Sequence, residues 1–196
     1  GTVVTSRQWG KSLLGQNLLL YWLLATPNQK GCWISPIYNQ ARKVFSELMD
    51  ASSSIIQSSN KAELTLKFIN GSTVQFLSSE RPDSVRGFSF NYMIVDEAAY
   101  VNERGFETAI LPTLTALGKK CLIISTPKSK NWFYKYYLRG LDGSTEYISF
   151  RGQSTDNPYI DQSFIAEQRL SLPDDIFRQE YMAEFTDAGS EVFRNV

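Results

Sequence analysis

The sequence predicts an α/β domain with a mainly parallel, twisted sheet and helices on both of its faces. Three observations support this prediction. Strand-like and helix-like segments alternate along most of the chain. Two uninterrupted apolar runs, at 92–95 and 121–125, are typical of central parallel strands that are buried on both sides. The dipeptide Asn70-Gly71 between two strand-like segments indicates one antiparallel hairpin.

The first part of the chain predicts two strands and two helices. A first strand ends at Val3-Val4, and residues 11–25 are apolar nearly all round, which predicts a helix buried centrally against the sheet. Residues 31–35 form a short strand. Apolar residues at helical spacing across 41–49 then predict an amphipathic helix.

The predicted hairpin joins the segments 64–68 and 74–77. Its turn is expected to be of type I′, because Asn70 and Gly71 both tolerate a positive φ. Between the two central strands lies a helical region that Pro112 interrupts.

Near the end of the chain the alternation of strands and helices gives way to short helices. A last strand is predicted at 146–150, and two short amphipathic helices follow at about 162–172 and 174–185. We therefore expect a core domain over residues 1–150 and a small helical subdomain over 151–196.

Composition excludes several kinds of chemistry. Twenty Lys and Arg residues balance 20 Asp and Glu residues, so net charge does not favour a nucleic-acid partner. The sequence has no histidine, which excludes His-activated nucleophiles and His-ligated metals. Cys32 and Cys121 are expected to be buried, reduced thiols, as in a reducing compartment. No apolar run approaches the ~18 residues that a membrane span requires.

A candidate phosphate-binding loop, Thr5 to Ser12, lies between the first strand and the first helix. Gly10, Lys11 and Ser12 match the end of the pattern Gly, four residues, Gly-Lys-Ser/Thr, whereas Thr5 replaces its first glycine. Backbone N–H groups at a helix start bind phosphate oxygens, Lys11 would bridge the β- and γ-phosphates, and Ser12 would bind Mg²⁺. The alternative is an ordinary helix start with a solvated lysine.

Two carboxylates follow the apolar run 92–95. A buried strand that ends in Asp96 places this side chain at the edge of the sheet where α/β folds bind ligands. Asp96 would belong to the Mg²⁺ shell, and Glu97 would orient and polarise an attacking water. An acidic turn after a strand is the alternative, but the two motifs in this order favour an ATPase.

Four parts of the chain carry a specific combination of motifs. They are Ser6-Arg7-Gln8-Trp9-Gly10-Lys11-Ser12, Pro82-Asp83-Ser84-Val85-Arg86-Gly87 with Asp96-Glu97-Ala98-Ala99, Ile123-Ile124-Ser125-Thr126-Pro127, and Phe177-Arg178-Gln179-Glu180-Tyr181-Met182-Ala183-Glu184-Phe185. These stretches resemble the large terminase subunits of tailed double-stranded DNA bacteriophages, in which they correspond to a deviant phosphate loop, a segment leading to the acidic pair, a coupling motif and the end of a lid. The resemblance covers nearly the whole chain.

The resemblance implies a RecA-like P-loop NTPase fold of the ASCE type, with ATP and Mg²⁺ as cofactors. Ser12 and Asp96 would hold the metal, and Glu97 would be the catalytic carboxylate. Arg7 would contact the γ-phosphate or be displaced by it. Arg86 would be an arginine finger that reaches a neighbouring subunit, with a plain surface arginine as the alternative. The implied nucleotide-binding set is Ser6, Arg7, Gln8, Trp9, Gly10, Lys11, Ser12, Ser125 and Thr126.

The implied function is ATP hydrolysis that drives viral double-stranded DNA into a procapsid. The implied partners are the DNA, the portal protein and the small terminase subunit, with a ring of identical subunits on the portal and a monomer in isolation. The implied location is the host cytoplasm. An adenine-contacting segment and an RNase H-like nuclease are not found in this chain, so we interpret it as a fragment that does not cleave DNA. Lys128 and Lys130 are a possible phosphate-contacting pair, although a solvated loop is the simpler interpretation.

Three other functions compete with this one. A superfamily-2 helicase shares the three motifs but requires a second motor domain, for which the helical tail is too short. A nucleotide-binding regulatory module without turnover would lack the carboxylate of Glu97. A purely structural α/β domain would make the agreement of the motifs a coincidence. For Ser125-Thr126-Pro127 alone, the alternative is a strand end closed by proline.

Overall fold

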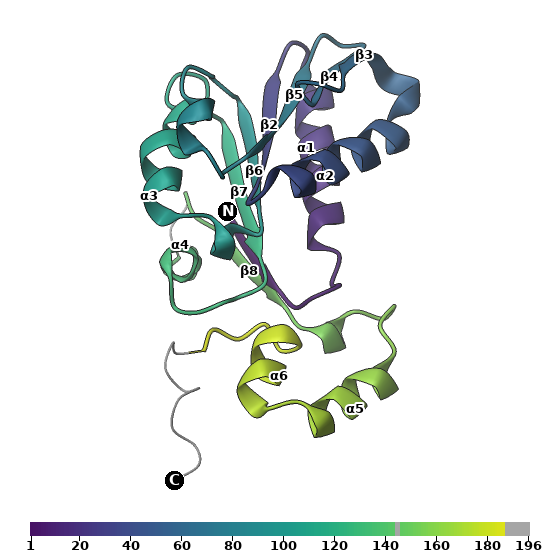
Figure 1. Ribbon diagram of the computed structural model, residues 1–196, viewed down its shortest axis with the longest axis vertical. Helices are drawn as coiled ribbons and strands as arrows, with labels where there is room; N and C mark the ends of the chain where they lie inside the picture. The colour runs from purple at the N-terminus through teal and green to yellow at the C-terminus, as the bar shows by residue number, and fades with distance from the viewer. Residues whose placement is uncertain (144–145, 187–196) are drawn as a thin grey trace. The chain divides into compact units, whose positions relative to one another are not determined.

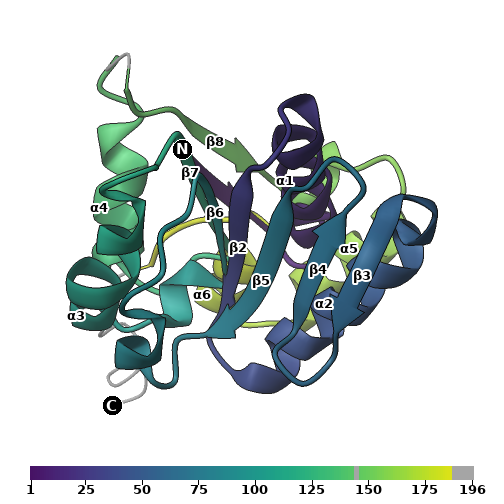
Figure 2. The same cartoon turned by 90° about the horizontal axis from the view of Figure 1, so that it is seen from above.

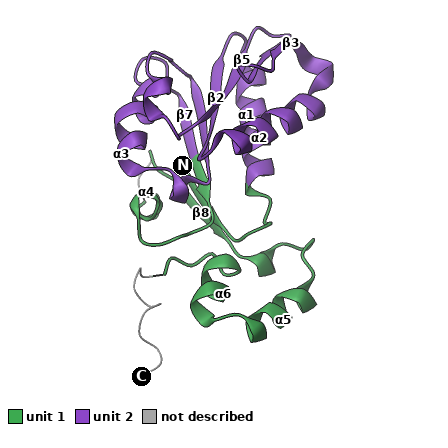
Figure 3. Ribbon diagram, viewed as in Figure 1, with its two compact units in different colours: residues 1–11, 123–196 green, residues 12–122 purple. Residues whose placement is uncertain are grey.

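The computed structural model describes residues 1–143 and 146–186 and confirms the α/β prediction (Figure 1). The chain divides into two compact units, which Figure 3 distinguishes by colour. The larger unit comprises residues 12–122, and the smaller unit comprises residues 1–11 and 123–196.

A mostly parallel set of strands forms the core of the larger unit. Strand β2 pairs in parallel with both β5 and β6, which places Trp33 opposite Phe76 on one side and Ile94 on the other. All five residues of β6 are buried. Figure 2 shows these strands side by side, in the order β3-β4-β5-β2-β6. Their bounds are β2 Lys30–Ser35, β3 Ile56–Asn60, β4 Thr65–Phe68, β5 Thr73–Ser78 and β6 Tyr92–Asp96.

Helices cover both faces of these strands. Helix α1, Lys11–Ala25, and helix α2, Tyr38–Ala51, lie on one face (Figure 1). On the other face lies the helical region around α3, Glu103–Gly105, which continues through a π turn at Phe106–Ile110 and a 3-10 turn at Leu111–Leu114. The predicted interruption at Pro112 therefore corresponds to a change of helix type. The proline is the second residue of the last turn and has no backbone N–H to donate to the π turn before it.

Helix α1 packs against the sheet as predicted, although it is more exposed than its nearly all-round apolar sequence suggested. Leu19 and Leu23 are fully buried, and they pack so closely on Gly31 that a Cβ there would meet their δ-carbons at 3.1 Å. Leu13 and Tyr21, however, are 64% and 67% exposed. The helix lies on one face of the sheet, so only one stripe of its surface is covered.

The hairpin prediction is confirmed, but its predicted turn type is wrong. Strands β4 and β5 are antiparallel. Phe68 O accepts the Gly71 N–H and Ser72 O accepts the Phe68 N–H, both at 2.9 Å. Gly71 has φ +81°, whereas Asn70 is not among the residues with positive φ. This is a three-residue loop with a left-handed glycine at its end. Asn70 instead uses its side chain to bond Leu23 O and the Ser72 N–H.

The antiparallel part of the sheet is larger than predicted. Strand β3 pairs antiparallel with β4, and the sequence pattern did not indicate it. Four of the five residues of β3 are exposed, and the segment is polar. An edge strand with little burial does not need the apolar alternation by which strands are identified in a sequence.

The smaller unit has strand β1, Thr2–Thr5, at its centre. It pairs in parallel with the end of β7, Lys120–Ser125, and with β8, Ser149–Gly152. Helix α4, Trp132–Arg139, was not predicted; its residues Trp132 and Phe133 are buried. The last strand was predicted at 146–150, so the prediction begins three residues and ends two residues before the observed strand.

The two predicted helices near the end of the chain are present. They are α5, Gln162–Ser171, and α6, Asp174–Glu180, so the second helix ends earlier than predicted. The division into units does not follow the predicted boundary at residue 150, which stays a prediction, and residues 187–196 of the predicted subdomain lie outside the described residues. Within the described ranges no helix is long and apolar enough to cross a membrane.

Both cysteines are thiols that burial keeps protonated. Cys32 is fully buried, and burial raises its pKa well above the ordinary value. The residue Cys121 is partly exposed, but burial of its thiol raises its pKa to about 11. Neither group is therefore a reactive thiolate near neutral pH.

Candidate nucleotide-binding site

In the larger unit, the structure brings together three of the predicted residues. Asp96 ends strand β6 and is only 7% exposed. Its Oδ2 accepts a hydrogen bond from Ser12 Oγ at 3.0 Å, across 84 positions of sequence. Its Oδ1 accepts the backbone N–H of Glu97 at 2.9 Å. The carboxylate therefore links the start of α1 to the end of β6, as the two motifs predicted.

Glu97 occupies an unusual backbone conformation. Its φ of 48° and ψ of 44° are left-handed, which is uncommon for a residue other than glycine. The residue precedes the 3-10 turn Ala98–Tyr100, and its carbonyl accepts the Tyr100 N–H at 2.9 Å. This conformation bends the chain out of the strand directly after Asp96. Strained residues of this kind concentrate at functional sites.

Arg86 lies on the surface of the larger unit. Its side chain is 59% exposed, and Nε is 2.6 Å from Asp83 Oδ1 in a local ion pair. The residue follows the 3-10 turn Pro82–Val85 and precedes Gly87, whose φ is +90°. An exposed arginine on a tight turn can be reached by another molecule, which its predicted role requires.

The predicted phosphate loop lies in the smaller unit up to Lys11. Gln8 has φ 57° and Gly10 has φ 99°, so the loop turns twice through the left-handed region. Gln8 and Gly10 are exposed, whereas Lys11, the first residue of α1, is only 9% exposed. A helix start favours anions through its backbone N–H groups and its dipole, so a mostly buried lysine there adds positive charge where phosphate binds.

The loop is held against later segments of the same unit. Ser6 N–H donates to Gly152 O at 3.1 Å, and Arg7 N–H donates to Glu180 O at 3.0 Å. The Trp9 indole lies against Gly152 so closely that no Cβ fits there. These contacts fix the loop before any nucleotide binds.

Three buried hydroxyls at the ends of β1 and β7 lack hydrogen-bond partners among the described residues: Thr5 Oγ1, Ser6 Oγ and Thr126 Oγ1. The strand register pairs Val4 with Ser125, so Thr5 and Thr126 follow at neighbouring strand ends. Buried polar groups are normally hydrogen-bonded, and the carboxyl ends of parallel strands are where α/β folds bind ligands. These orphaned hydroxyls fit a ligand that is rich in oxygen acceptors.

Thr5 is a candidate site residue that the motif comparison did not identify. The sequence marked it only as a departure from glycine. Its position at the end of the first strand, directly before the loop, was the signal that could have identified it. Ser125 differs from its neighbours, because its Oγ donates to Thr126 O at 2.8 Å.

The residues present also fit a magnesium ion. The Ser12 hydroxyl and the Asp96 carboxylate are oxygen ligands, which Mg²⁺ prefers. Where the structure is described, no group of three or more His, Cys, Asp or Glu side chains could hold a metal. Mg²⁺ is usually held by one or two carboxylates together with phosphate oxygens, and Asp96 would be one of these carboxylates.

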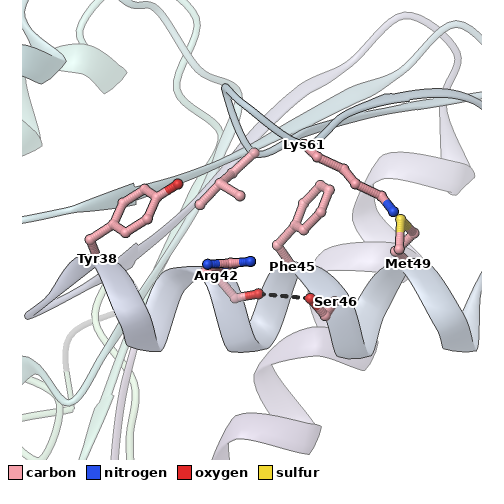
Figure 4. A pocket seen from close by; sticks show the side chains of 7 residues that line it. Tyr38, Arg42, Phe45, Ser46, Met49 and Lys61 are labelled. Carbon is pink, nitrogen blue, oxygen red and sulfur yellow. Dashed lines mark hydrogen bonds between the residues drawn. The ribbon is translucent and has the colours of Figure 1, made fainter.

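A cavity of about 390 Å³ in the larger unit lies between α2 and the turn that joins β3 to β4 (Figure 4). Figure 4 shows Arg42 and Phe45 on the helix and Lys61 reaching across from the turn. None of the predicted site residues lines it. The cavity is therefore separate from the predicted nucleotide site. Its lining residues are Tyr38, Arg42, Phe45, Ser46, Met49, Lys61 and Leu64.

Lys128 and Lys130 are both exposed in the loop after the coupling motif. Exposure suits either a phosphate contact or a solvated loop, so their role stays a prediction.

Comparisons with known proteins agree with the resemblance. The family described as terminase large subunit, T4likevirus-type, N-terminal, matches residues 2–196. The terminase large subunit of Escherichia phage T5 is 32% identical over 198 residues, which cover 98% of this chain and 45% of that protein. That of Thermus virus P23-45 is 31% identical over 222 residues, which cover 95% of this chain and 46% of that protein. The chain thus spans about half the length of these relatives.

Solved structures match as well. The large terminase ATPase domain of Thermus phage P74-26 superposes with a TM-score of 0.82 at 31% identity, covering 94% of this chain and 88% of that one. The large terminase of a thermophilic bacteriophage, solved in complex with ATP-gamma-S, shares the fold, with a TM-score of 0.78 at 14% identity, covering 95% of this chain and 47% of that one. These likenesses do not favour the helicase alternative. The chain belongs to the terminase large subunit family and corresponds to its ATPase domain.

Proposed function

We propose that this domain binds ATP with Mg²⁺ and hydrolyses it to drive viral double-stranded DNA into a procapsid. The observation that carries the proposal is the hydrogen bond from Ser12 Oγ to Asp96 Oδ2, at 3.0 Å. It joins the end of the phosphate-loop motif to the acidic pair, which a nucleotide-hydrolysing site requires and a structural domain does not. The large terminase that was solved with ATP-gamma-S has the same fold, and this supports a nucleotide as the ligand.

The loop and the strand ends would bind the phosphates. Lys11 and the backbone N–H groups at the start of α1 provide positive charge and donors for phosphate oxygens. The backbone N–H groups of Gln8, Trp9 and Gly10 would form the rest of the cradle. Those of Ser6 and Arg7 already donate to Gly152 O and Glu180 O, so these two residues would contribute through their side chains. Ser125 ends strand β7 and Thr126 follows it, and the unpartnered Thr126 hydroxyl would gain or lose a hydrogen bond as phosphate leaves.

The two acidic residues would have different roles, Asp96 in metal binding and Glu97 in catalysis. Ser12 and Asp96 would hold the Mg²⁺, which neutralises charge on the phosphate oxygens when bound. Glu97 would accept a hydrogen bond from the attacking water and orient it. Arg7 would stabilise charge on the terminal phosphate from within the same subunit.

The partners follow from the family and from surface properties. Because its charge is balanced, this domain has no general electrostatic attraction to DNA, so DNA contact would rest on a local patch or on another domain. We propose a ring of identical subunits on the portal protein, assembled with the small terminase subunit in the host cytoplasm. The exposed Arg86 would complete the site of a neighbouring subunit in that ring.

The substitution Glu97→Gln tests this function. We expect ATP binding to persist, because the phosphate cradle remains, and turnover to fall by about 10²–10⁴, the usual contribution of a general base. Binding is measured by calorimetry, and phosphate release is measured with portal protein and double-stranded DNA present. Glu107→Gln is the control, because it makes the same change at an exposed glutamate of the same unit that lies outside the proposed site.

Turnover that survives Glu97→Gln would exclude the catalytic role. An equal loss of binding and turnover would instead show that the residue is structural. A wild-type protein that binds no ATP in the presence of Mg²⁺ would contradict the proposed function altogether.

A further inference from the structure

The cavity beside α2 follows the helix for three turns. Its lining residues on the helix recur every three or four positions and so lie along one stripe: Tyr38, Arg42, Phe45 and Met49 (Figure 4). From residue 38 to residue 49 a helix rises by about 16 Å, at about 1.5 Å per residue. The cavity is therefore a groove that is elongated along α2.

The opposite wall of the groove is the turn between β3 and β4, and it is rigid. Asn60 Oδ1 accepts the N–H groups of Ala62 and Glu63, at 3.0 and 3.1 Å. Leu64 has a left-handed φ of 49°, which is uncommon for leucine, and its carbonyl accepts the Phe76 N–H at 2.9 Å. A ligand therefore meets a wall that is already ordered, so binding loses little conformational entropy there.

The groove has an apolar floor and two partly exposed apolar side chains at its ends. Phe45 and Leu64 are each 2% exposed, and Phe45 packs edge-on against Phe76, with ring centroids 5.5 Å apart. Tyr38 is 45% exposed and Met49 is partly exposed. An apolar ligand group would cover these two side chains, and a methionine adapts its shape to what it contacts.

Positive charge comes from both walls of the groove. Arg42 on the helix and Lys61 on the turn are exposed, and within the described residues neither forms an ion pair with a carboxylate. No acidic residue lines the groove. Lys43, the neighbour of Arg42, differs because its Nζ is 3.8 Å from Glu47 Oε1. The described part of the protein therefore leaves the two charges of the groove without a counter-charge.

These properties indicate the class of ligand. Two cations beside apolar side chains suit an anionic molecule that also carries an apolar group. Double-stranded DNA supplies phosphates along a rigid convex surface with few apolar groups, so it matches only the charge. An extended peptide rises by about 3.3 Å per residue, so about five residues span the groove.

We propose that the groove beside α2 binds a short extended segment of a partner protein that is both acidic and apolar. An apolar side chain of the segment packs against Tyr38 and Met49, and its carboxylates pair with Arg42 and Lys61. Alternate side chains of an extended chain point to the same side, so acid and apolar residues recur at every second position of the segment. The proposal is independent of the nucleotide site, since no predicted site residue lines the groove.

The three methionines of the chain provide the test. In protein labelled with ¹³C at the methionine methyl groups, Met49 reports on the groove, whereas Met93 is fully buried and Met182 belongs to the smaller unit. The probe is the peptide Glu-Ser-Phe-Ser-Glu with both ends blocked. We expect it to shift the Met49 resonance in a saturable manner and to leave the resonances of Met93 and Met182 in place.

Altered peptides separate the contribution of charge from that of the apolar contact. Gln-Ser-Phe-Ser-Gln should bind about three- to tenfold more weakly than the acidic peptide, the effect of losing two exposed ion pairs. Glu-Ser-Ser-Ser-Glu should also bind more weakly, because it lacks the ring that covers apolar surface.

Protein variants assign the charge effect to the groove. Arg42→Gln and Lys61→Gln should each weaken the acidic peptide about two- to fivefold and leave the glutamine peptide unchanged. Lys43→Gln is the matched control, because it removes the same charge from the same helix at a residue that does not line the groove, and it should change neither affinity.

A Met49 resonance that stays in place up to millimolar acidic peptide would overturn the proposal. So would equal affinity for the acidic and the glutamine peptides, or equal effects of the Arg42 and Lys43 substitutions. A short DNA duplex is titrated in parallel. If the duplex shifts Met49, Arg42→Gln abolishes that shift and the peptide causes none, the groove is a nucleic-acid contact and the peptide proposal falls.

Discussion

Gly152→Ala, at the end of strand β8, should disturb the phosphate loop, because Gly152 lies against Trp9 of that loop. A Cβ at Gly152 would stand 2.6, 2.7 and 2.9 Å from three atoms of the Trp9 indole, whereas ordinary contact begins at 3.4 Å. The indole or the strand must therefore shift by up to about 0.8 Å, the difference between 3.4 and 2.6 Å. Overpacking of this kind costs about 1–3 kcal/mol in the free energy of unfolding. Trp9 directly precedes Gly10 in the loop, so nucleotide affinity should fall as well.

A double-mutant cycle measures this contact. The free energy of unfolding in urea is determined for wild type, Gly152→Ala, Trp9→Leu and the double variant. Without the indole, Gly152→Ala should be neutral or stabilise by about 0.5–1 kcal/mol, because alanine loses less backbone entropy than glycine on folding. If Gly152→Ala destabilises both backgrounds equally, the clash with Trp9 is not the cause and the reasoning is refuted.

Two further predictions concern the core and the assembly. Leu66→Ala should lower the free energy of unfolding, measured by urea titration, by about 2–5 kcal/mol, because Leu66 is fully buried in β4. Leu170→Ala, at a 90% exposed position, should change it by less than about 0.5 kcal/mol. Equal effects of the two substitutions would contradict the described core. Arg86→Ala subunits keep Glu97, and Glu97→Gln subunits keep Arg86. A mixed ring on the portal should therefore recover ATP hydrolysis, because an arginine finger supplied by a neighbouring subunit contributes about 10³–10⁵ in rate. A mixed ring that stays inactive, or Arg86→Ala alone at the wild-type assembled rate, would exclude the role in trans.

Local pattern was sufficient for much of the fold. Strands β2, β5, β6 and β7 were predicted because buried strands need runs of apolar residues or apolar alternation. Helices α1, α2, α5 and α6 were also predicted close to their observed positions. Strand β3 escaped prediction because it is an exposed edge, and α4 was not identified from its sequence. The turn at Asn70 differed because its side chain bonds Leu23 O, a contact that two adjacent residues do not reveal.

By itself the sequence determined the order of the chemical groups: a Gly10-Lys11-Ser12 helix start, an Asp96-Glu97 strand end, and a hydroxyl pair after β7. It did so because these groups depend on residue type and on the position of a strand or helix beside them, which are local properties. Only the tertiary structure decided which of them touch. The Ser12–Asp96 hydrogen bond, the orphaned hydroxyls and the Arg7–Glu180 ion pair depend on the path of the backbone between distant positions, and that path is set by packing over the whole domain.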